Sequence, residues 1–369
     1  MLIGVDASRA NLARKTGVEW YSYHLINELK KIPLSSGDNF VLYSPTRLLD
    51  GLGVLPSAWK SEILSWPLKY LWTQIRLSAK TFFRPPDVLF VPAHALPIFS
   101  RARNIITLHD LGFERFPELY DFWQCLYLRF VYRFAGRHAK IIITPSEFTK
   151  KELTERYKIK PERIKVVALG YDKNSFHPLL DHEATRNFLA EHQINEPYLL
   201  YVGRLEKKKN IRNLLEAFLA VSAENKNLKL VLVGAPGYGY EEFGELIARY
   251  PNRLIHLPHL TQREISYLYS RALSFIFPSW YEGFGLPILE AMACGCPVLA
   301  SSTSSIPEVA GEAAFYFKPD DKTDMANAIK KIVADGHLRQ ELIGRGWLRI
   351  KNFSWSRCAQ ETYQILLNK

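Results

Sequence analysis

Short apolar segments alternate with longer helical patterns along the whole chain. The segments are rich in Val, Ile and Leu and lack polar alternation, as expected of strands covered on both faces. In the first half they are Leu2–Val5, Phe40–Tyr43, Val88–Val91, Asn104–Leu108, Ile141–Thr144 and Lys165–Ala168. In the second half they are Tyr198–Val202, Leu228–Val233, Leu254–His256, Ser274–Pro278 and Pro297–Ala300. Strand–helix–strand alternation predicts right-handed crossovers, parallel sheets and an α/β fold.

Several helix ends are marked by their capping residues. Thr261 and Glu264 form a capping box that predicts a helix over 262–272. Pro287 suits the first turn of a helix, and Gly295 suits the position just after its end. Ser146 is expected to cap a helix that includes Phe148–Tyr157.

A polar segment, Gly170–Pro197, separates the two sets of strands. It contains Pro178 and Pro197 and a short helical pattern near 181–192. The pattern therefore predicts two doubly wound, Rossmann-like domains, over 1–175 and 176–355. Ligands are expected where the carboxyl ends of the strands face the space between the domains.

Composition restricts the class of protein. Of the 369 residues, 47% are apolar and 23% charged, which is typical of a globular protein and excludes disordered, collagen-like and coiled-coil chains. The 48 basic and 37 acidic residues leave a net charge of +11. This excess predicts an anionic partner, such as nucleotide phosphates, anionic lipid or nucleic acid. Aromatic residues, at 13%, exceed what a simple polyanion-binding tail carries.

Targeting and redox signals point to the cytoplasm. The first residues lack a basic segment, and their apolar run stops at Asp6, unlike a signal peptide. No segment reaches the ~20 apolar residues of a membrane span. The four cysteines do not form a disulfide framework, and Cys294 and Cys296 lack a second ligand pair at zinc spacing. We therefore expect these two cysteines to serve packing.

The most informative motif is Pro278–Gly295. A predicted strand ends there, Gly283 and Gly285 follow, and a helix starts near Pro287. Glycines before a helix N-terminus create an anion site, because free N–H groups and the positive end of the dipole meet there. Glu282 and Glu290 are better suited to sugar hydroxyls, so the motif suggests a ligand with both phosphate and sugar. The alternative is a glycine-containing loop with a solvated glutamate.

Three further positions could carry chemistry. Gly203–Asn210 follows the first strand of the second half and places Arg204 and Lys209 before the next helix. Lys207 and Lys208, in the same segment, are expected to be solvated. His109 ends a strand, where a neutral imidazole could donate or accept, although such a histidine is often structural. Gly17 begins the helix after the first strand.

Other signatures are absent from the sequence. Gly234–Gly239 follows a strand, but Pro236 interrupts it and Glu242 stands where a dinucleotide fingerprint needs glycine. Phosphate-loop, zinc-protease and GxSxG motifs are not found. No two aspartates stand at positions i and i+2, which argues against a metal-binding Asp-x-Asp.

Together these residues resemble the retaining glycosyltransferases of family 4, which have the GT-B architecture of two Rossmann-like domains facing across a cleft. Glu282 and Glu290, with seven residues between them, look like the family signature, and Gly203 and Arg204 with Lys209 look like its diphosphate clamp. Further similar segments are Thr107–Asp110, Thr144–Thr149, Val233–Gly234 and Ile306–Gly311. The resemblance runs from the first strand to Phe353–Trp355. It implies that the first domain is on the acceptor side, that the second domain binds the nucleotide-sugar donor, and that the final helix, within 356–369, packs on the first domain.

The resemblance also implies residue roles. Glu282 would contact the donor sugar, Glu290 the ribose, and Arg204 and Lys209 the diphosphate, while His109 would lie beside the anomeric centre. The implied catalytic set is His109, Arg204, Lys209 and Glu282, and the implied donor-binding set is Gly17, Gly203, Gly283, Phe284, Gly285, Leu286 and Glu290. Family members often have a second glycine where this chain has Glu19, so Glu19 is expected to face the acceptor instead.

The implied reaction moves a hexose from a nucleotide-diphosphate sugar to a hydroxyl of a glycan or lipid-linked saccharide, with the α configuration retained. Neither metal nor cofactor is expected. The motifs look most like mannosyltransferases that use GDP-mannose. Alternatives are another GT-B enzyme, such as a sugar-nucleotide epimerase or phosphorylase, and a non-catalytic polyanion-binding protein. The chain contains no recognised nucleic-acid module, so no nucleic acid is expected as partner.

Two segments of the first domain combine aromatic and basic residues. They are Trp59–Phe83, which includes Lys60, Lys69, Arg76 and Lys80, and Phe122–Arg137, which includes Arg129 and Arg133. Such helices can lie on an anionic membrane, which would place the protein peripherally on its inner face. The alternative is core-facing aromatics beneath a solvated basic surface.

Overall fold

The structure is a computed structural model that describes residues 1–35, 37–49, 51–68, 70–93, 95–178, 182–194 and 197–368. The chain forms two compact units. Unit 1 comprises Met1–Glu114, Phe122–Gly170 and Ser354–Lys369, and unit 2 comprises Arg115–Asp121 and Tyr171–Phe353. The boundary between the units therefore falls after Gly170, whereas the sequence analysis placed it after residue 175.

Unit 1 contains a parallel sheet of seven strands in the order β3-β2-β1-β4-β5-β6-β7. The strands are β1 (Leu2–Asp6), β2 (Asn39–Ser44), β3 (Trp59–Ile63), β4 (Val88–Val91), β5 (Arg103–Thr107), β6 (Ile141–Thr144) and β7 (Ile164–Val166). The helical segments are α1 (Gly17–Leu29), η1 (Trp72–Leu77), α2 (Ser78–Phe83), α3 (Gly112–Arg115), α4 (Phe122–His138), α5 (Glu147–Tyr157), η3 (Pro161–Arg163) and α14 (Trp355–Leu367).

Unit 2 contains a second parallel sheet, of six strands in the order β10-β9-β8-β11-β12-β13. The strands are β8 (Tyr198–Val202), β9 (Lys229–Val233), β10 (Leu254–Leu257), β11 (Ser274–Phe277), β12 (Val298–Ser301) and β13 (Ala314–Phe317). The helical segments are η2 (Pro117–Leu119), α6 (His182–Glu191), η4 (Lys207–Lys209), α7 (Ile211–Ser222), α8 (Glu241–Arg249), α9 (Gln262–Arg271), α10 (Leu286–Ala293), α11 (Ile306–Ala310), η5 (Gly311–Ala313), α12 (Lys322–Ala334), α13 (Gly336–Arg349) and η6 (Ile350–Asn352).

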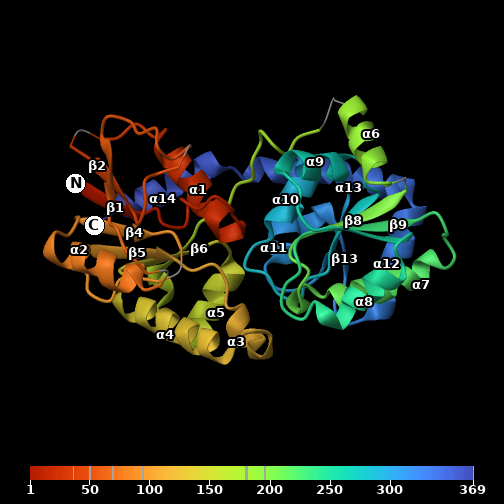
Figure 1. Ribbon diagram of the computed structural model, residues 1–369, viewed down its shortest axis with the longest axis horizontal. Helices are drawn as coiled ribbons and strands as arrows, with labels where there is room; N and C mark the ends of the chain where they lie inside the picture. The colour runs from red at the N-terminus through yellow and green to blue at the C-terminus, as the bar shows by residue number, and fades with distance from the viewer. Residues whose placement is uncertain are drawn as a thin grey trace. The chain divides into compact units, whose positions relative to one another are not determined.

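Each sheet is covered by helices on both faces, as the non-alternating apolar strands predicted. In unit 1, α1 and α14 pack together on one side, and α2, α4 and α5 lie on the other (Figure 1). In unit 2, α7, α8 and α12 cover one face and α9, α10 and α13 the other (Figure 1). The core of unit 2 includes Phe218 from α7, Phe243 from α8 and Ile329 from α12, packed with Leu230 and Leu232 of β9.

The predicted strands are all present, with ends that shift by at most a few residues. Both strands that the pattern missed, β3 and β13, lie at sheet edges. Strand β3 reads Trp-Lys-Ser-Glu-Ile and is exposed along most of its length, so it lacks the apolar run used to predict the others. The capping box at Thr261, the proline in the first turn of α10 and the Ser146 cap are confirmed.

The membrane interpretation of Trp59–Phe83 was wrong for its first part. Trp59 belongs to β3 and is buried, with its ring stacked on Phe40 at a centroid distance of 4.1 Å. Trp72 is also buried, and its Nε1 donates to the Leu64 carbonyl at 2.7 Å. Both aromatic side chains are therefore part of the unit 1 core at the edge of the sheet, where the edge strand β3 has only one neighbouring strand. Lys69 lies outside the described residues.

The final helix, α14, belongs to unit 1. Trp355 at its start stacks on His24 of α1, and the Arg103 side chain donates to the Leu366 carbonyl near its end. A Cβ on Gly170 would lie 2.0 Å from the Trp355 backbone nitrogen. The chain therefore leaves unit 1 at Gly170 and re-enters it at Ser354 in direct contact, and only glycine fits at position 170.

The four cysteines are buried and unpaired, as the packing interpretation of Cys294 and Cys296 requires. In the part of the chain that the structure describes, no helix has the length and apolarity to cross a membrane.

Candidate functional site

The order of the unit 2 sheet reverses between β8 and β11, so the loops that follow these two strands meet at one edge. The loop after β8 starts at Gly203, and the loop after β9 starts at Gly234. A Cβ on Gly234 would lie 2.1 Å from the Gly203 carbonyl oxygen, and both glycines have positive φ, 151° and 139°. These glycines allow the strand ends to turn in close contact, a role of Gly234 that the sequence analysis missed.

Lys209 and Glu282 are brought together by the loops that follow β8 and β11. The Lys209 Nζ lies 2.5 Å from Glu282 Oε1, and the two side chains are only 17% and 14% exposed. Two predicted catalytic residues, 73 positions apart, thus form one partly desolvated ion pair. Charge-assisted contacts of this kind are short and strong.

Serines and a threonine after β12 fix the loop that carries Glu282. Ser305 Oγ donates to the carbonyls of Glu282 at 2.9 Å and Phe284 at 3.0 Å, and the Glu282 N–H donates to Ser304 Oγ at 3.1 Å. Thr303 Oγ1 donates to the Trp280 carbonyl at 3.0 Å. The sequence analysis missed these residues; their signal was a run of hydroxyl side chains directly after a predicted strand.

Helix α10 begins within the same loop. Gly285 caps it with φ 115°, which favours glycine, and Leu286 and Pro287 form its first turn. Gly283 and Phe284, which precede it, are buried. The predicted loop residues thus lie at a helix N-terminus, where backbone N–H groups and the helix dipole favour an anion.

Glu290 lies farther along α10, in an environment that disfavours charge. Burial and, to a smaller extent, the nearby charge of Asp172 together raise the pKa of its carboxyl to about 8. At neutral pH the carboxyl is therefore mostly protonated and both donates and accepts hydrogen bonds. Asp172 was not predicted, because a single aspartate in a polar segment carries no signal.

Arg204 and Asn210 complete the loop after β8. Tyr201 Oη donates to the Arg204 carbonyl at 3.0 Å, while the guanidinium is exposed beside Gly237. Asn210 is buried in the left-handed conformation, with φ 59°. Its Nδ2 donates to the carbonyls of Pro278 at 3.1 Å and Pro319 at 2.7 Å. Asn210, which the sequence analysis passed over, therefore ties three loops together directly after Lys209.

His109 lies in unit 1, after β5. Its Nε2 is 3.0 Å from the Pro92 carbonyl, and its ring meets Tyr21 edge-on at 4.6 Å. Because a carbonyl only accepts, Nε2 carries the proton and Nδ1 is left as an acceptor. Burial lowers the pKa of His109, against smaller opposite effects of the Pro92 hydrogen bond and of Asp110 and Glu19. The imidazole is therefore neutral at pH 7.

Gly17 and Glu19 lie at the start of α1 in unit 1. Gly17 is the first helical residue, and a Cβ there would meet nothing within 4 Å. Glu19 closes a capping box: its carboxylate accepts from the Thr16 N–H at 3.1 Å. Arg9 also lies 3.9 Å from this carboxylate. The glutamate that replaces a family glycine thus has a structural use in this helix.

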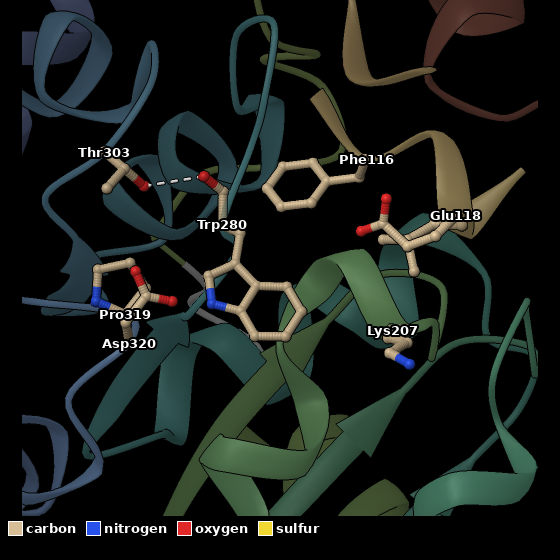
Figure 2. A pocket seen from close by; sticks show the side chains of 8 residues that line it. Phe116, Glu118, Lys207, Trp280, Thr303, Pro319 and Asp320 are labelled. Atoms are coloured by element: carbon tan, nitrogen blue, oxygen red, sulfur yellow. Dashed lines mark hydrogen bonds between the residues drawn. The ribbon is translucent and has the colours of Figure 1, made fainter. Parts of the chain in front are cut away.

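A cavity of about 300 Å³ lies in unit 2 beside the Glu282 loop (Figure 2). It is lined by Phe116, Glu118, Leu119, Lys207, Trp280, Thr303, Pro319 and Asp320. The Phe116 and Trp280 rings are nearly parallel, at 23°, with centroids 6.2 Å apart. Aromatic faces together with carboxylates suit a neutral polyhydroxyl ligand better than a phosphate, which two carboxylates would repel.

No group of three or more His, Cys, Asp or Glu side chains among the described residues is arranged to hold a metal ion. Of the predicted residues, Gly203, Arg204, Lys209, Glu282, Gly283, Phe284, Gly285, Leu286 and Glu290 lie in unit 2, on the loops after β8 and β11 and on α10. Gly17 and His109 lie in unit 1.

Two family models together match most of the chain. The model described as Glycosyltransferase Family 4 matches residues 15–175, and the model described as Glycosyl transferases group 1 matches residues 185–347. The chain belongs to this glycosyltransferase family. The family resemblance drawn from Glu282, Glu290, Arg204 and Lys209 is therefore confirmed.

Relatives of this glycosyltransferase include two mannosyltransferases. O-antigen chain mannosyltransferase B of Escherichia coli is 29% identical, over 95% of this chain and 96% of that protein. O-antigen chain mannosyltransferase RfbU of Salmonella typhimurium is 27% identical, over 73% of this chain and 70% of that protein. These relatives do not favour an epimerase, a phosphorylase or a polyanion-binding protein.

Solved structures share the fold of this glycosyltransferase. Sucrose-phosphate synthase from Thermosynechococcus elongatus superposes with a TM-score of 0.75 at 21% identity, over 99% of this chain and 98% of that chain. WaaG, a glycosyltransferase involved in lipopolysaccharide biosynthesis, superposes with a TM-score of 0.76 at 15% identity over 100% of both chains. The predicted GT-B fold class, with two Rossmann-like parallel-sheet domains, is confirmed.

Proposed function

We propose that this glycosyltransferase moves mannose from GDP-mannose to a hydroxyl of a glycan or lipid-linked saccharide, with retention of the α configuration. The observation that carries the proposal is the Lys209–Glu282 contact at 2.5 Å, formed where the sheet order of unit 2 reverses. It places a cation for a diphosphate and an acceptor for sugar hydroxyls side by side.

Two comparisons support the donor. The relatives that match most of this chain are named as O-antigen mannosyltransferases. Anabaena Alr3699/HepE, with a TM-score of 0.76 at 17% identity, was solved in complex with UDP and glucose. A nucleotide-diphosphate sugar is consistent with both, and the names of the relatives support mannose as the proposed sugar.

Arg204 and Lys209 would stabilise the leaving diphosphate. The exposed Arg204 offers a planar fork for phosphate oxygens, and Lys209 a compact charge held in place by Glu282. Charge fixed before reaction stabilises the negative charge that develops on the leaving group. With two such cations and no Asp-x-Asp in the sequence, the proposed reaction needs no divalent cation.

Glu290 would bind the ribose. A charged carboxylate beside a diphosphate is unfavourable, but the raised pKa of Glu290 leaves it uncharged near neutral pH. A protonated carboxyl binds a hydroxyl pair as both donor and acceptor without repelling the phosphate. An uncharged Glu290 is compatible with a diphosphate bound at the N-terminus of α10, the helix that carries this residue.

His109 would act as a neutral group beside the anomeric centre. Its Nε2 is engaged with the Pro92 carbonyl, so Nδ1 remains to accept a hydrogen bond from a sugar hydroxyl. Its lowered pKa does not favour a role as general acid at pH 7.

The acceptor saccharide would occupy the cavity of Figure 2. Trp280 lies two positions before Glu282 in the same loop, so a sugar stacked on its ring is held next to the donor residues. Glu118 and Asp320 would accept from sugar hydroxyls. Trp280→Leu should raise the acceptor KM roughly tenfold while donor binding stays unchanged; an unchanged acceptor KM would remove the cavity from the proposal.

The donor is tested by thermal stabilisation with GDP-, UDP- and ADP-sugars, followed by transfer assays with saccharide acceptors. GDP-mannose is expected to raise Tm most, and Glu290→Ala to weaken this shift, while Arg204→Ala chiefly slows turnover. EDTA should leave the rate unchanged, and NMR of the product should show an α linkage. No Tm shift with any donor at millimolar concentration would contradict the proposed site.

A further inference from the structure

Helix α13 holds the end of α11, the short helix that follows the loop serines of the candidate site. Arg349, the last residue of α13, is half-buried, and its Nε donates to the Val309 carbonyl at 2.9 Å. Its Nη2 donates to the Glu308 carbonyl at 2.5 Å. The last carbonyls of a helix have no partner within that helix, so a guanidinium that donates to two of them fixes the helix end. Gly311 follows with φ 56°, and α11 ends there.

The start of α11 is bound to the loop that follows β11, residues 278–285, which we call the Glu282 loop. Ser305 precedes the first turn of α11, and its Oγ donates to the carbonyls of Glu282 and Phe284 at 2.9 and 3.0 Å. The Ser305 carbonyl accepts from the Val309 N–H at 3.0 Å. The five-residue helix α11 therefore connects the Arg349 guanidinium to the backbone on both sides of Gly283.

A second line of contact reaches the same loop through aromatic rings. The Arg349 Cζ lies 5.1 Å from the centroid of the Phe353 ring. The Phe353 ring meets the Phe284 ring at 77°, with centroids 5.9 Å apart, and both side chains are buried. Arg349 thus supports the Glu282 loop through its hydrogen bonds to α11 and through the ring on which its guanidinium lies.

Another arginine of α13 makes the same kind of contact at a different helix. Arg339 is also half-buried, and its Nη1 donates to the carbonyls of Ile332 and Val333 at 2.7 and 2.8 Å. These carbonyls lie at the end of α12, which packs on α7, β12 and β13. Arg339 is therefore matched to Arg349 in residue type, burial and bonding, and it contacts neither α11 nor Phe353 through these bonds.

We propose that Arg349 is a positioning residue for the proposed transfer reaction. It holds the Glu282 loop so that the Glu282 carboxylate stays beside Lys209 and the donor sugar, and it acts through α11 and Phe353. A sugar-binding group on a loop is aligned only as well as the backbone that carries it. The inference rests on the proposed function, because Glu282 is taken as the residue that binds the donor sugar.

The first test needs no ligand. It compares Arg349→Met with Arg339→Met by hydrogen–deuterium exchange of the free enzyme. The peptide that contains residues 279–286 should exchange at least about tenfold faster in Arg349→Met, because local opening of the loop becomes easier. It should exchange as in the wild type in Arg339→Met. Urea unfolding should show similar losses of stability in both variants, because each loses two hydrogen bonds to carbonyls at a helix end.

Kinetics separate positioning from a general loss of stability. Arg349→Met should lower kcat roughly tenfold or more, because a small displacement of a substrate-binding group slows turnover strongly. The affinity for GDP alone should stay unchanged, because GDP lacks the sugar that Glu282 is proposed to bind. Arg349→Lys keeps the charge and can donate to one carbonyl, so it should recover part of the kcat. Arg339→Met should retain the wild-type kcat and GDP affinity.

A double-variant cycle identifies the path of the effect. Ser305→Ala and Arg349→Met should each speed the exchange of residues 279–286. The double variant should show less than the product of the two fold-changes, because both substitutions break the connection through α11. Phe353→Leu with Arg349→Met tests the aromatic path in the same way. Independent effects in both cycles would contradict the two paths.

The outcomes distinguish this inference from the proposed function. If no nucleotide sugar bound to the wild type, the proposed function would fail, and the exchange data would still show whether Arg349 holds the loop. If the wild type transferred mannose from GDP-mannose, an unchanged kcat in Arg349→Met would overturn the positioning role alone. Wild-type exchange of residues 279–286 in Arg349→Met, or an equal loss of kcat in Arg339→Met, would overturn it as well. Should Arg349→Met fail to fold, the same measurements on Arg349→Lys decide.

Discussion

Lys209 Nζ lies 2.5 Å from Glu282 Oε1, and both side chains are shielded from solvent by the loops that follow β8 and β11. Each charge of the pair is therefore compensated by the other. In the proposed reaction the diphosphate would share Lys209, and the sugar hydroxyls would share Glu282. The proposed donor site is thus preorganised at the level of one ion pair.

Replacing either member should be costly for turnover and stability. Lys209→Met is expected to lower kcat/KM by roughly 10²–10³-fold, and to lower the free energy of unfolding by about 1–3 kcal/mol because Glu282 loses its partner. Glu282→Gln should lower kcat/KM as well. The double variant should cost less than the sum, as expected of coupled residues.

The control for this pair is Lys322→Met, which breaks an ion pair with Glu216 at 2.7 Å on the exposed surface. It should change stability by less than about 1 kcal/mol and leave turnover intact. Additive losses in the Lys209/Glu282 cycle, measured by urea unfolding and steady-state kinetics, would refute the coupling.

Glu290 should make stability depend on pH. Its carboxyl has a pKa of about 8 in the folded protein, against 4.5 as the ordinary value. Between these values the folded state holds a proton that the unfolded state has lost, so wild-type stability falls as pH rises. Glu290→Gln should remove this fall, at about 1.4 kcal/mol per pH unit where it is steepest.

Urea unfolding at pH 5, 6.5 and 8 measures the effect. The stability advantage of Glu290→Gln should grow with pH up to about 8. Glu245→Gln, which changes an exposed glutamate of α8, should follow the wild type at every pH. A constant difference between Glu290→Gln and wild type would contradict the raised pKa.

His109 should remain neutral and protonated on Nε2. Burial lowers its pKa, so ¹⁵N NMR of labelled histidine should show the Nε2–H form between pH 6 and 8. The rate of transfer should show no inflection near pH 6.5 from this residue. A charged imidazole or an Nδ1–H form at pH 7 would remove the proposed acceptor role of Nδ1.

Substitution by alanine should lower stability at one glycine and leave it nearly unchanged at another. At Gly170 a Cβ would meet the Trp355 backbone at 2.0 Å, so Gly170→Ala should lower the free energy of unfolding by about 1–3 kcal/mol or more. At Gly17 the space is open, so Gly17→Ala should stay within about 0.5 kcal/mol of wild type. Lower turnover in stable Gly17→Ala would support a ligand that approaches this backbone, and equal stabilities of the two variants would contradict the packing at Gly170.

The strands, and the residues of the candidate site that the structure brings together in unit 2, have signals that are local in the sequence. Strands covered on both faces have continuous apolar runs, and Glu282, Glu290, Arg204 and Lys209 stand in dense motifs. The edge strand β3 has no such run, which led Trp59 to be assigned to a membrane surface when it stacks on Phe40. Whether a side chain of an edge strand is buried depends on residues from other parts of the chain that pack against it, such as Phe40 against Trp59.

The supporting residues of the site could not be predicted for a different reason. Ser305 and Asn210 are ordinary loop residues in the sequence, and their partners, Glu282, Phe284, Pro278 and Pro319, are distant along the chain. These residues meet their partners because β8, β11 and β12 are neighbours in the sheet, and the sequence does not give this strand order.

Helix α14 has a consequence for how the protein is made. It follows unit 2 in the sequence, yet its side chains Trp355, Cys358, Tyr363 and Leu366 are buried in unit 1. A ribosome therefore delivers all seven strands of the first sheet, then residues 171–353 of unit 2, and only afterwards the helix that packs beside α1. The first domain to emerge is the last to be finished, and a nascent chain leaves the apolar face beneath this helix bare throughout the synthesis of its insert.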